Sequence, residues 1–478
     1  EQSLYYIDKE FNFYAFHIPT QKNEFIANLG KEIQERGKIS SIVHYHNSYF
    51  VGFLMDGILL LEKQKETDHY QIQSLPINSG VFCLKKDRFQ DVVWIGTDGQ
   101  GVYLYSNPLY SIKSMVLSNY TEKIERPVRA IYLDDERTFW VGTKGNGILK
   151  IYDYEFNKNI SDCRAEVLTT SNSALSSNAV YCFAKSHRNL LWIGDEEGLT
   201  YYSYREKRIK SIPIRIGNED FKYIHDIYET ADSELWLASV GMGVVKARIA
   251  GTPDNPVIVD AQRYIINDGE LGSNYFFTIY AENETNLLFG NKGYGVFRYN
   301  ETTNGLEPVS THKYENMTLN NILAIGKDSS NNYLFGTSYG LIKYTSETSY
   351  QLFNAKNGFL NNTIHAILRN SSDNFWLSTN LGLINFDTKR NVFRSYGFGD
   401  GLKVVEFSDG AAFRDSRTGT LFFGGINGVV AIRADGRPEQ LYMPPVYFDK
   451  LSIFGEQYNL GEFLTRKKET EVLNLQYD

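Results

Sequence analysis

Histidine and cysteine supply most metal sites and many nucleophiles in proteins, and this chain has few of either. Of its eight histidines, only His44 and His46 have the alternating spacing that places two side chains on one side of a strand. No third ligand accompanies them, so we interpret them as a strand pair. Cys83 and Cys182 fall at matching places in apolar runs, which predicts buried structural thiols. The sequence therefore predicts no metal and no cofactor.

Carboxylates are the other possible source of chemistry, because two carboxyl groups about 5 to 10 Å apart can hydrolyse a glycosidic bond. The chain has 57 acidic residues, and most fall in runs typical of turns, where a carboxylate bonds to the local backbone. These include residues 134–136 and 195–197, Asp226 and Asp232. No nucleophile elbow, His-Glu-x-x-His motif or phosphate-binding loop occurs. We therefore predict no catalytic residues and no enzyme, and keep a glycan-active enzyme as the alternative.

The elements that would position any site come from an internal repeat. An aromatic or aliphatic pair, a small residue, a polar turn and a glycine recur along the chain, most clearly at 94–101, 140–147 and 192–198. The small residues fall at positions 52, 96, 142, 194, 238, 290, 336, 378 and 424, which are 42 to 52 residues apart. That period is typical of a four-stranded propeller blade. We expect Trp140, Trp192, Trp236 and Trp376 to fill the gaps between neighbouring blades, and the small residues to allow close packing near the axis.

Composition agrees with an all-β chain and excludes some partners. Aromatic residues make up 14% of the 478 residues, and 39 glycines outnumber 11 prolines, as strands joined by tight turns require. The 49 basic and 57 acidic residues are spread out, so a nucleic acid is not an expected partner. No apolar stretch reaches the length of a membrane span.

The repeats and the C-terminal part resemble a known family. Units such as 94–101 resemble the regulator-type propeller repeats in periplasmic sensor regions of hybrid two-component systems of gut Bacteroidetes. The ordered run through 399–413, 419–428 and 444–455 resembles the last blade leading into an immunoglobulin-like Y-Y-Y domain. The departures are Ala238 and Ser378 at the small-residue position.

The resemblance implies the domain order and the surroundings. Residues 1–115 would be the last two to three blades of a truncated upstream propeller, and 116–440 a seven-bladed β-propeller. Residues 441–478 would begin an immunoglobulin-like β-sandwich, through which the protein would form a homodimer. The chain would then be the periplasmic part of an inner-membrane protein that resembles a histidine kinase and controls transcription.

Propeller ligands usually bind where loops converge at one end of the ring. The turns after the small-residue strands and the entries into the next inner strands should meet there. Amides, amines and aromatic faces at these places suit an oligosaccharide, although a turn-forming role is the simpler interpretation of each asparagine. The predicted ligand-binding residues are Gln100, Lys144, Asn146, Asn274, Tyr275, Lys292, Tyr294 and Tyr339. We expect ligand sensing, with a plain glycan-binding scaffold as a further alternative.

Overall fold

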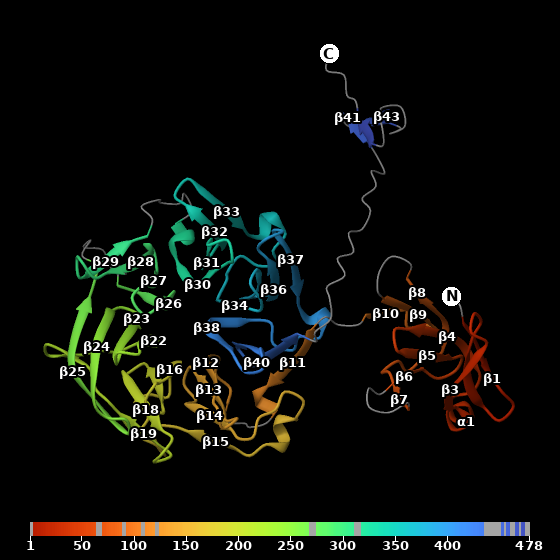
Figure 1. Ribbon diagram of the computed structural model, residues 1–478, viewed down its shortest axis with the longest axis horizontal. Coiled ribbons are helices and arrows are strands. Elements are labelled where there is room, and N and C mark those ends of the chain that lie inside the picture. Colours follow the sequence, from red (N-terminus) through yellow and green to blue (C-terminus); the bar gives the residue numbers. More distant parts are fainter. Residues whose placement is uncertain are drawn as a thin grey trace. The chain divides into compact units, whose positions relative to one another are not determined.

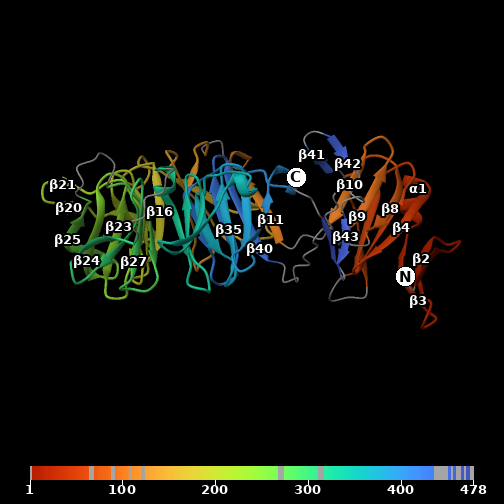
Figure 2. The same cartoon turned by 90° about the horizontal axis from the view of Figure 1, so that it is seen from above.

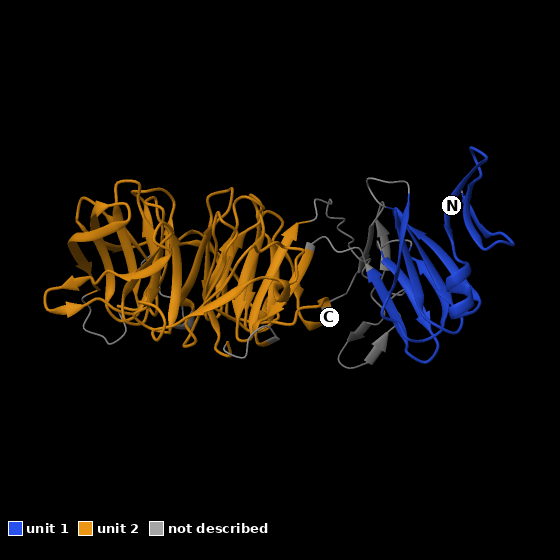
Figure 3. Cartoon of the chain, turned by 90° about the horizontal axis from the view of Figure 1, so that it is seen from below, with its two compact units in different colours: residues 1–109, 436–478 blue, residues 110–435 orange. Residues whose placement is uncertain are grey.

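The computed structural model describes residues 3–63, 69–87, 92–106, 110–119, 124–266, 274–309 and 317–434, and four short strands between 451 and 473. The chain divides into two compact units, one of residues 110–435 and one of 1–109 with 436–478 (Figure 3). The described residues are almost entirely strands. Their one α-helix, α1 (Gly30–Arg36), has seven residues, and no described helix has the length and apolar character needed to cross a membrane.

The larger unit is a ring of seven four-stranded antiparallel sheets (Figure 1). Seen from above, the strands run across the thickness of the ring (Figure 2). The innermost strand is the first strand of each of the first six sheets and β38 in the seventh, so we call β12, β16, β22, β26, β30, β34 and β38 the inner strands. The first three sheets are β12 (Val128–Leu133), β13 (Phe139–Thr143), β14 (Ile148–Ile151), β15 (Ala165–Leu168); β16 (Val180–Lys185), β17 (Leu190–Asp195), β18 (Leu199–Ser203), β19 (Arg208–Ser211); and β22 (Ile224–Glu229), β23 (Glu234–Ser239), β24 (Gly243–Thr252), β25 (Asn255–Tyr264). The next three are β26 (Phe276–Ala281), β27 (Leu287–Asn291), β28 (Gly295–Asn300), β29 (Gly305–Pro308); β30 (Ile322–Lys327), β31 (Tyr333–Thr337), β32 (Gly340–Ser346), β33 (Ser349–Phe353); and β34 (Ala366–Arg369), β35 (Asn374–Thr379), β36 (Gly382–Asp387), β37 (Val392–Tyr396).

The seventh sheet closes the ring with strands from both ends of the unit. It contains β38 (Phe407–Arg414), β39 (Leu421–Gly425), β40 (Gly428–Ala434) and, as its outer strand, β11 (Tyr110–Val116). β11 pairs with β40 from Tyr110 opposite Ala434 to Val116 opposite Gly428, and β38 packs against β12. The ring therefore begins at 110 and not at 116, because the segment before the first sheet supplies the last sheet's outer strand.

Tryptophans fill the spaces between neighbouring sheets of the ring, as predicted. Trp140, Trp192, Trp236 and Trp376 are buried, and each lies in an apolar cluster drawn from two adjacent sheets. Trp192, for example, packs with residues of β18 and β22 and donates its indole N–H to the buried Glu229 at 2.7 Å. The Trp192 side chain thus packs between the sheets and also has a hydrogen-bond acceptor for its indole N–H.

The small residues of the repeat are required by close packing between inner parts of adjacent sheets. A Cβ atom on Gly194 would lie 2.5 Å from Sγ of Cys182 and 2.9 Å from the carbonyl oxygen of Ile224. Both distances are shorter than any real carbon contact, so glycine is needed there. Ala238 and Ser378 take the place of glycine in the third and sixth sheets, and both are fully buried.

Residues 1–109 of the smaller unit form three described sheets. They are β1 (Ser3–Ile7), β2 (Asn12–His17), β3 (Lys22–Asn28); β4 (Ile39–Tyr45), β5 (Ser48–Phe53), β6 (Ile58–Lys63), β7 (Tyr70–Ser74); and β8 (Val81–Lys86), β9 (Val92–Thr97), β10 (Val102–Ser106). The sheet of β8–β10 corrects one expectation. Cys83, expected to be buried, is exposed, and the nearby Trp94 is 40% exposed, because no described sheet covers the face on which they lie.

The C-terminal residues form two short hairpins where they are described. These are β41 (Leu451–Ile453) with β42 (Glu456–Tyr458) and β43 (Leu464–Lys467) with β44 (Thr470–Leu473). Most of the segment expected to begin an immunoglobulin-like domain, 441–478, lies outside the described residues.

Candidate functional site

Two sets of loops meet at one end of the ring, as the register of the repeats predicted. In the first six sheets, the turn after the second strand bonds to the segment that enters the next inner strand. In the first sheet, Lys144 N–H donates to Pro127 and Gly145 N–H donates to Asn178 at 3.0 Å. Isolated bridges join Lys144 to Ala179 and Lys292 to Asn321 in the same way. We call this the loop end.

Two of the predicted ligand-binding residues hold the loops themselves. Oδ1 of Asn146 accepts N–H bonds from Glu125 and Arg126, at 3.1 and 2.7 Å. Oδ1 of Asn274 accepts the N–H of Ile266 at 2.8 Å. Asparagine forms such local bonds readily, so these acceptor oxygens are already used to hold the loops.

The remaining predicted residues of the ring present cationic and aromatic groups. Lys144 and Lys292 are exposed, and Nζ of Lys292 lies 5.9 Å from the ring centre of Tyr275. Tyr294 and Tyr339 are half-buried. Tyr294 packs against the apolar cluster between the third and fourth sheets, and Tyr339 against the one between the fourth and fifth. These five side chains are the part of the predicted set that a ligand at the loop end can contact.

Gln100 is not joined to the others in the described structure. It belongs to the smaller unit, where its side-chain N–H donates to Asn78 at 3.4 Å and its carbonyl oxygen accepts from Tyr103 at 3.2 Å.

Sequence reasoning missed a set of residues at the start of the inner strands. In six of the seven sheets, a bulge shifts the register between the inner strand and its neighbour and leaves one or more residues unpaired. His365 lies at the corresponding position of the sixth sheet, one residue before β34. We call six of these side chains the inner-strand cluster: Arg129, Tyr181, His225, Phe277, His365 and Asp409. The available signal was the repeat itself, since the residue type at this position of the unit changes from blade to blade.

The polar half of the cluster centres on Asp409. Its Oδ1 lies 2.5 Å from Nδ1 of His365, and its Oδ2 lies 3.6 Å from Nη1 of Arg129. The other imidazole nitrogen of His365 lies 2.6 Å from Oδ1 of Asn380. One carboxylate thus connects the sixth, seventh and first sheets.

The aromatic half continues from Arg129 around the ring. The guanidinium lies 5.9 Å from the ring centre of Tyr181, which stacks on His225 at 4.4 Å and 22°. His225 in turn meets Phe277 edge-on at 5.5 Å. The contacts therefore run without a break from the sixth sheet to the fourth through the ring closure.

Burial and charge set the protonation of the cluster. Burial lowers the pKa of His225 to about 3, and Arg129 acts in the same direction. Burial alone would raise the pKa of Asp409, but its hydrogen bond to His365 and the charge of Arg129 outweigh it and hold that pKa below its usual value. Asp409 is therefore a carboxylate, and His225 is neutral.

The buried carboxylates elsewhere have structural partners. Burial raises the pKa of Asp195 to about 6, although its side chain accepts bonds from Ser176 and two turn N–H groups. Burial likewise raises the pKa of Asp226 to about 6. Asp226 was expected in a turn but lies on β22, where it accepts the N–H of Ile279 in the next sheet at 2.7 Å. Within the described residues, no group of three or more His, Cys, Asp or Glu side chains could hold a metal ion.

Seven sheets with inner strands around a central axis, closed by the pairing of β11 with β40, define a β-propeller protein. No family model matches the chain. The extracellular domain of the putative hybrid two-component system BT3049 from B. thetaiotaomicron is similar in structure, with a TM-score of 0.58 and 23% identity over 98% of this chain. The extracellular domain of the putative one-component system BT4673 from the same organism matches 96% of this chain, with a TM-score of 0.54 and 17% identity. This chain spans 65% and 59% of those two chains.

Two other similarities cover less of the chain. A catalytically inactive virginiamycin B lyase from Staphylococcus aureus matches 68% of this chain and 99% of its own length, with a TM-score of 0.51 and 14% identity. Translation initiation factor 6 from Saccharolobus solfataricus is 31% identical over 140 residues, which are 27% of this chain and 57% of that protein. At these identities the solved structures establish a shared propeller fold and nothing more specific.

Proposed function

We propose that this chain is part of the ligand-sensing, periplasmic region of an inner-membrane two-component regulator. The observation that carries the proposal is the extent of the structural match. The similarity to the extracellular domain of a hybrid two-component system runs through 98% of this chain and so includes both compact units, whereas the lyase matches 68%. Binding would change the arrangement of the propellers, and the C-terminal domain of a homodimer would transmit that change to a histidine kinase and a transcriptional response.

The proposed ligand is an oligosaccharide bound at the loop end. Two exposed amines are found in the turns of the loop end: Lys292 lies 5.9 Å from the ring centre of Tyr275, and Lys144 belongs to the first sheet. The aromatic side chains of Tyr294 and Tyr339 follow the second strands of the fourth and fifth sheets. Amines can bond sugar hydroxyls and aromatic faces can cover the C–H face of a sugar, which supports this choice of ligand.

The experiment that tests the function separates binding from catalysis. The complete extracytoplasmic region is titrated with a panel of oligosaccharides by calorimetry, and each mixture is then analysed by chromatography for products. Heat of binding without product supports a sensor. Turnover would instead support the glycan-active enzyme, and a bound ligand that leaves kinase activity of the full-length protein unchanged would support a plain scaffold.

The site is tested with exchanges that keep the fold. Because Tyr294 and Tyr339 are half-buried, their exchange for alanine would also reduce stability, so the paired Lys144→Ala and Lys292→Ala exchange is the cleaner variant. We expect at least a tenfold loss of affinity at unchanged thermal stability. Unchanged affinity would place the site elsewhere.

A further inference from the structure

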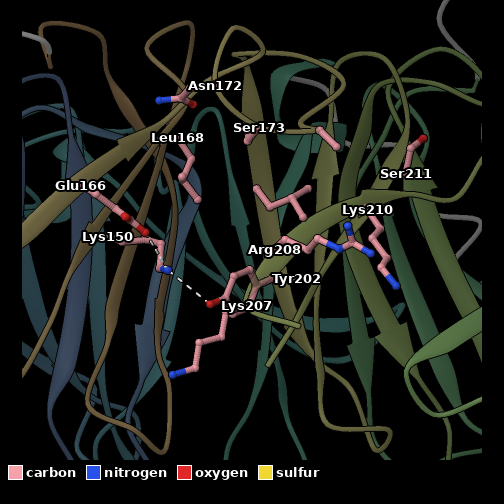
Figure 4. A pocket seen from close by; sticks show the side chains of 12 residues that line it. Lys150, Glu166, Leu168, Asn172, Ser173, Tyr202, Lys207, Arg208, Lys210 and Ser211 are labelled. Carbon is pink, nitrogen blue, oxygen red and sulfur yellow. Dashed lines mark hydrogen bonds and ion pairs between the residues drawn. The ribbon is translucent and has the colours of Figure 1, made fainter. Parts of the chain in front are cut away.

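A cavity of about 590 Å³ lies on the outer side of the ring, between the first and second sheets (Figure 4). Its walls come from β14 and β15 on one side and from β18 and β19 on the other. Asn172, Ser173 and Ser211 lie at one end of the view and Lys207 at the other. Its volume falls within the range of small-ligand pockets, about 300 to 1,000 Å³.

One wall of the cavity contains a lysine that is already neutralised. The side chain of Lys150 is 4% exposed, and its Nζ lies 2.9 Å from Oε1 of Glu166 and 4.6 Å from the ring centre of Trp140. Burial would raise the pKa of Glu166, but hydrogen bonds from Tyr152 and Lys150 lower it. Glu166 therefore stays ionised, and this pair adds no net charge to the cavity.

The opposite wall supplies one cation without a counter-charge. Arg208 and Lys210 both bond to Glu206, and Lys210 also bonds to Asn255 of the third sheet, so their charged groups lie on the far side of β19 from the first sheet. Lys207, at the start of the same wall, forms no ion pair among the described residues. Because Lys150 and Glu166 neutralise each other, Lys207 leaves the cavity with one positive charge.

The backbone at Lys207 strengthens the case that its side chain is used. Lys207 has a φ of +52°, in the left-handed region that lysine adopts at a cost. The fourth and sixth sheets have four-residue hairpins of the same kind, and there the corresponding residues are Asn304 and Asn391, with φ of +48° and +55°. Asparagine tolerates this conformation best among residues with a side chain. A lysine in this place adds a charge to the cavity that the hairpin itself does not need.

We propose that this cavity binds an anionic sugar residue, one that carries a carboxylate or a sulfate. The anionic group would face Lys207, the hydroxyl groups would bond to Asn172 and Ser173, and Leu168 and Ile209 would contact the C–H face. This proposal rests on the proposed function, since it takes the ligand to be an oligosaccharide.

The cavity is connected to the loop end by one loop. Residues 169–179 follow β15 and supply Asn172 and Ser173 to the cavity. The same loop accepts the N–H of Gly145 through the carbonyl of Asn178 at 3.0 Å. An occupied cavity can therefore alter the loop end through a hydrogen-bonded segment.

The test uses three tetrasaccharides of equal length and different charge, with the complete extracytoplasmic region. They are a hyaluronan tetrasaccharide with carboxylates only, a chondroitin sulfate tetrasaccharide with both groups, and neutral cellotetraose. The variant is Lys207→Asn, which removes the charge and suits the backbone. The matched control is Lys389→Asn, an exposed lysine in the corresponding hairpin of the sixth sheet.

We expect at least one charged tetrasaccharide to bind more tightly than cellotetraose, with an affinity that falls as salt rises. Lys207→Asn should weaken that binding at least fivefold at equal or higher melting temperature, and Lys389→Asn should leave it unchanged. Carboxylate and sulfate are distinguished by which charged probe binds.

Binding of cellotetraose as tightly as both charged probes, or full affinity in Lys207→Asn, would overturn the anionic cavity while leaving an oligosaccharide sensor intact. Binding of no saccharide in any arm or in the wider panel would overturn both proposals.

Discussion

Nδ1 of His365 lies 2.5 Å from Oδ1 of Asp409, and this contact joins the sixth and seventh sheets of the ring. The other carboxylate oxygen of Asp409 faces Arg129 of the first sheet at 3.6 Å. Asp409 therefore lies where the first and last sheets of the propeller meet, and it bonds to both of its neighbours. A carboxylate in this position stabilises the closed ring in addition to anything it contributes to a ligand site.

Asp409→Asn should reduce the free energy of unfolding of the ring by about 1 to 3 kcal/mol. The exchange keeps the shape of the side chain but leaves Arg129 without its counter-charge in a mostly buried place. The loss is measured by urea denaturation followed through tryptophan fluorescence, because four of the chain's five tryptophans lie in the ring. Asp153→Asn serves as the control, since Asp153 is 70% exposed and 3.9 Å from Arg137. Equal stability of Asp409→Asn and the control would contradict a closing role.

The stability contributed by His225 should depend on pH. Its folded pKa of about 3 lies below the unfolded value of 6.5, so the unfolded state binds more protons between these values and stability falls as pH falls. From pH 7 to pH 5 the loss is about 2 kcal/mol. His225→Phe should remove this loss while keeping the contacts with Tyr181 and Phe277. The quantity to measure is the difference in unfolding free energy between wild type and variant at each pH, and a constant difference would contradict the prediction.

Asp226 should show the opposite dependence. Its folded pKa of about 6 lies above the usual 3.8, so the folded state binds more protons and stability rises as pH falls through 6. Relative to Asp226→Asn, the wild type should gain about 1 kcal/mol between pH 7 and pH 5. The same denaturation series measures this gain, and a gain of zero or of the other sign would show that Asp226 is ionised in the folded state.

Trp192→Ala should destabilise the ring by about 3 to 5 kcal/mol, the usual cost of removing a buried aromatic side chain. The exchange opens a cavity between the second and third sheets and leaves the buried Glu229 without its indole donor. The comparison is Trp94→Ala in the smaller unit, where the exposed ring should contribute little to the ring transition. An equal loss of unfolding free energy in both variants would mean that Trp192 is not specifically required for the stability of the ring.

Gly194→Ala should cost about 1 to 3 kcal/mol, because the new methyl group overlaps Sγ of Cys182 and the backbone of Ile224. Adding Cys182→Ala removes the nearest of these atoms and should restore part of the loss. The thermal melting temperatures of the single and double variants measure this rescue. Strictly additive losses would show that the two side chains do not compete for the same space.

The local features of this propeller could be predicted from the amino-acid sequence because they repeat. The all-β class, the spacing of the small residues, the burial of the four ring tryptophans and the meeting of two sets of loops all depend on contacts within one sheet or between consecutive sheets. Those contacts recur with the same register in every unit, so a regular pattern in the sequence is enough to predict them. Gly194 is an example, since a Cβ there would overlap Cys182 of its own sheet and Ile224 of the next one.

The remaining features depend on how the ring closes. The pairing of β11 with β40 joins residues more than 300 positions apart, and no local pattern encodes such a partner. The contacts of Asp409 with both neighbouring sheets, and the exposure of Cys83 and Trp94, depend on which sheet lies next in space. The cationic cavity depends on two outer walls whose facing side chains differ in every unit. Side-chain neighbours across sheets are set by the tertiary arrangement, because the same strand position is buried, paired or exposed according to what packs against it.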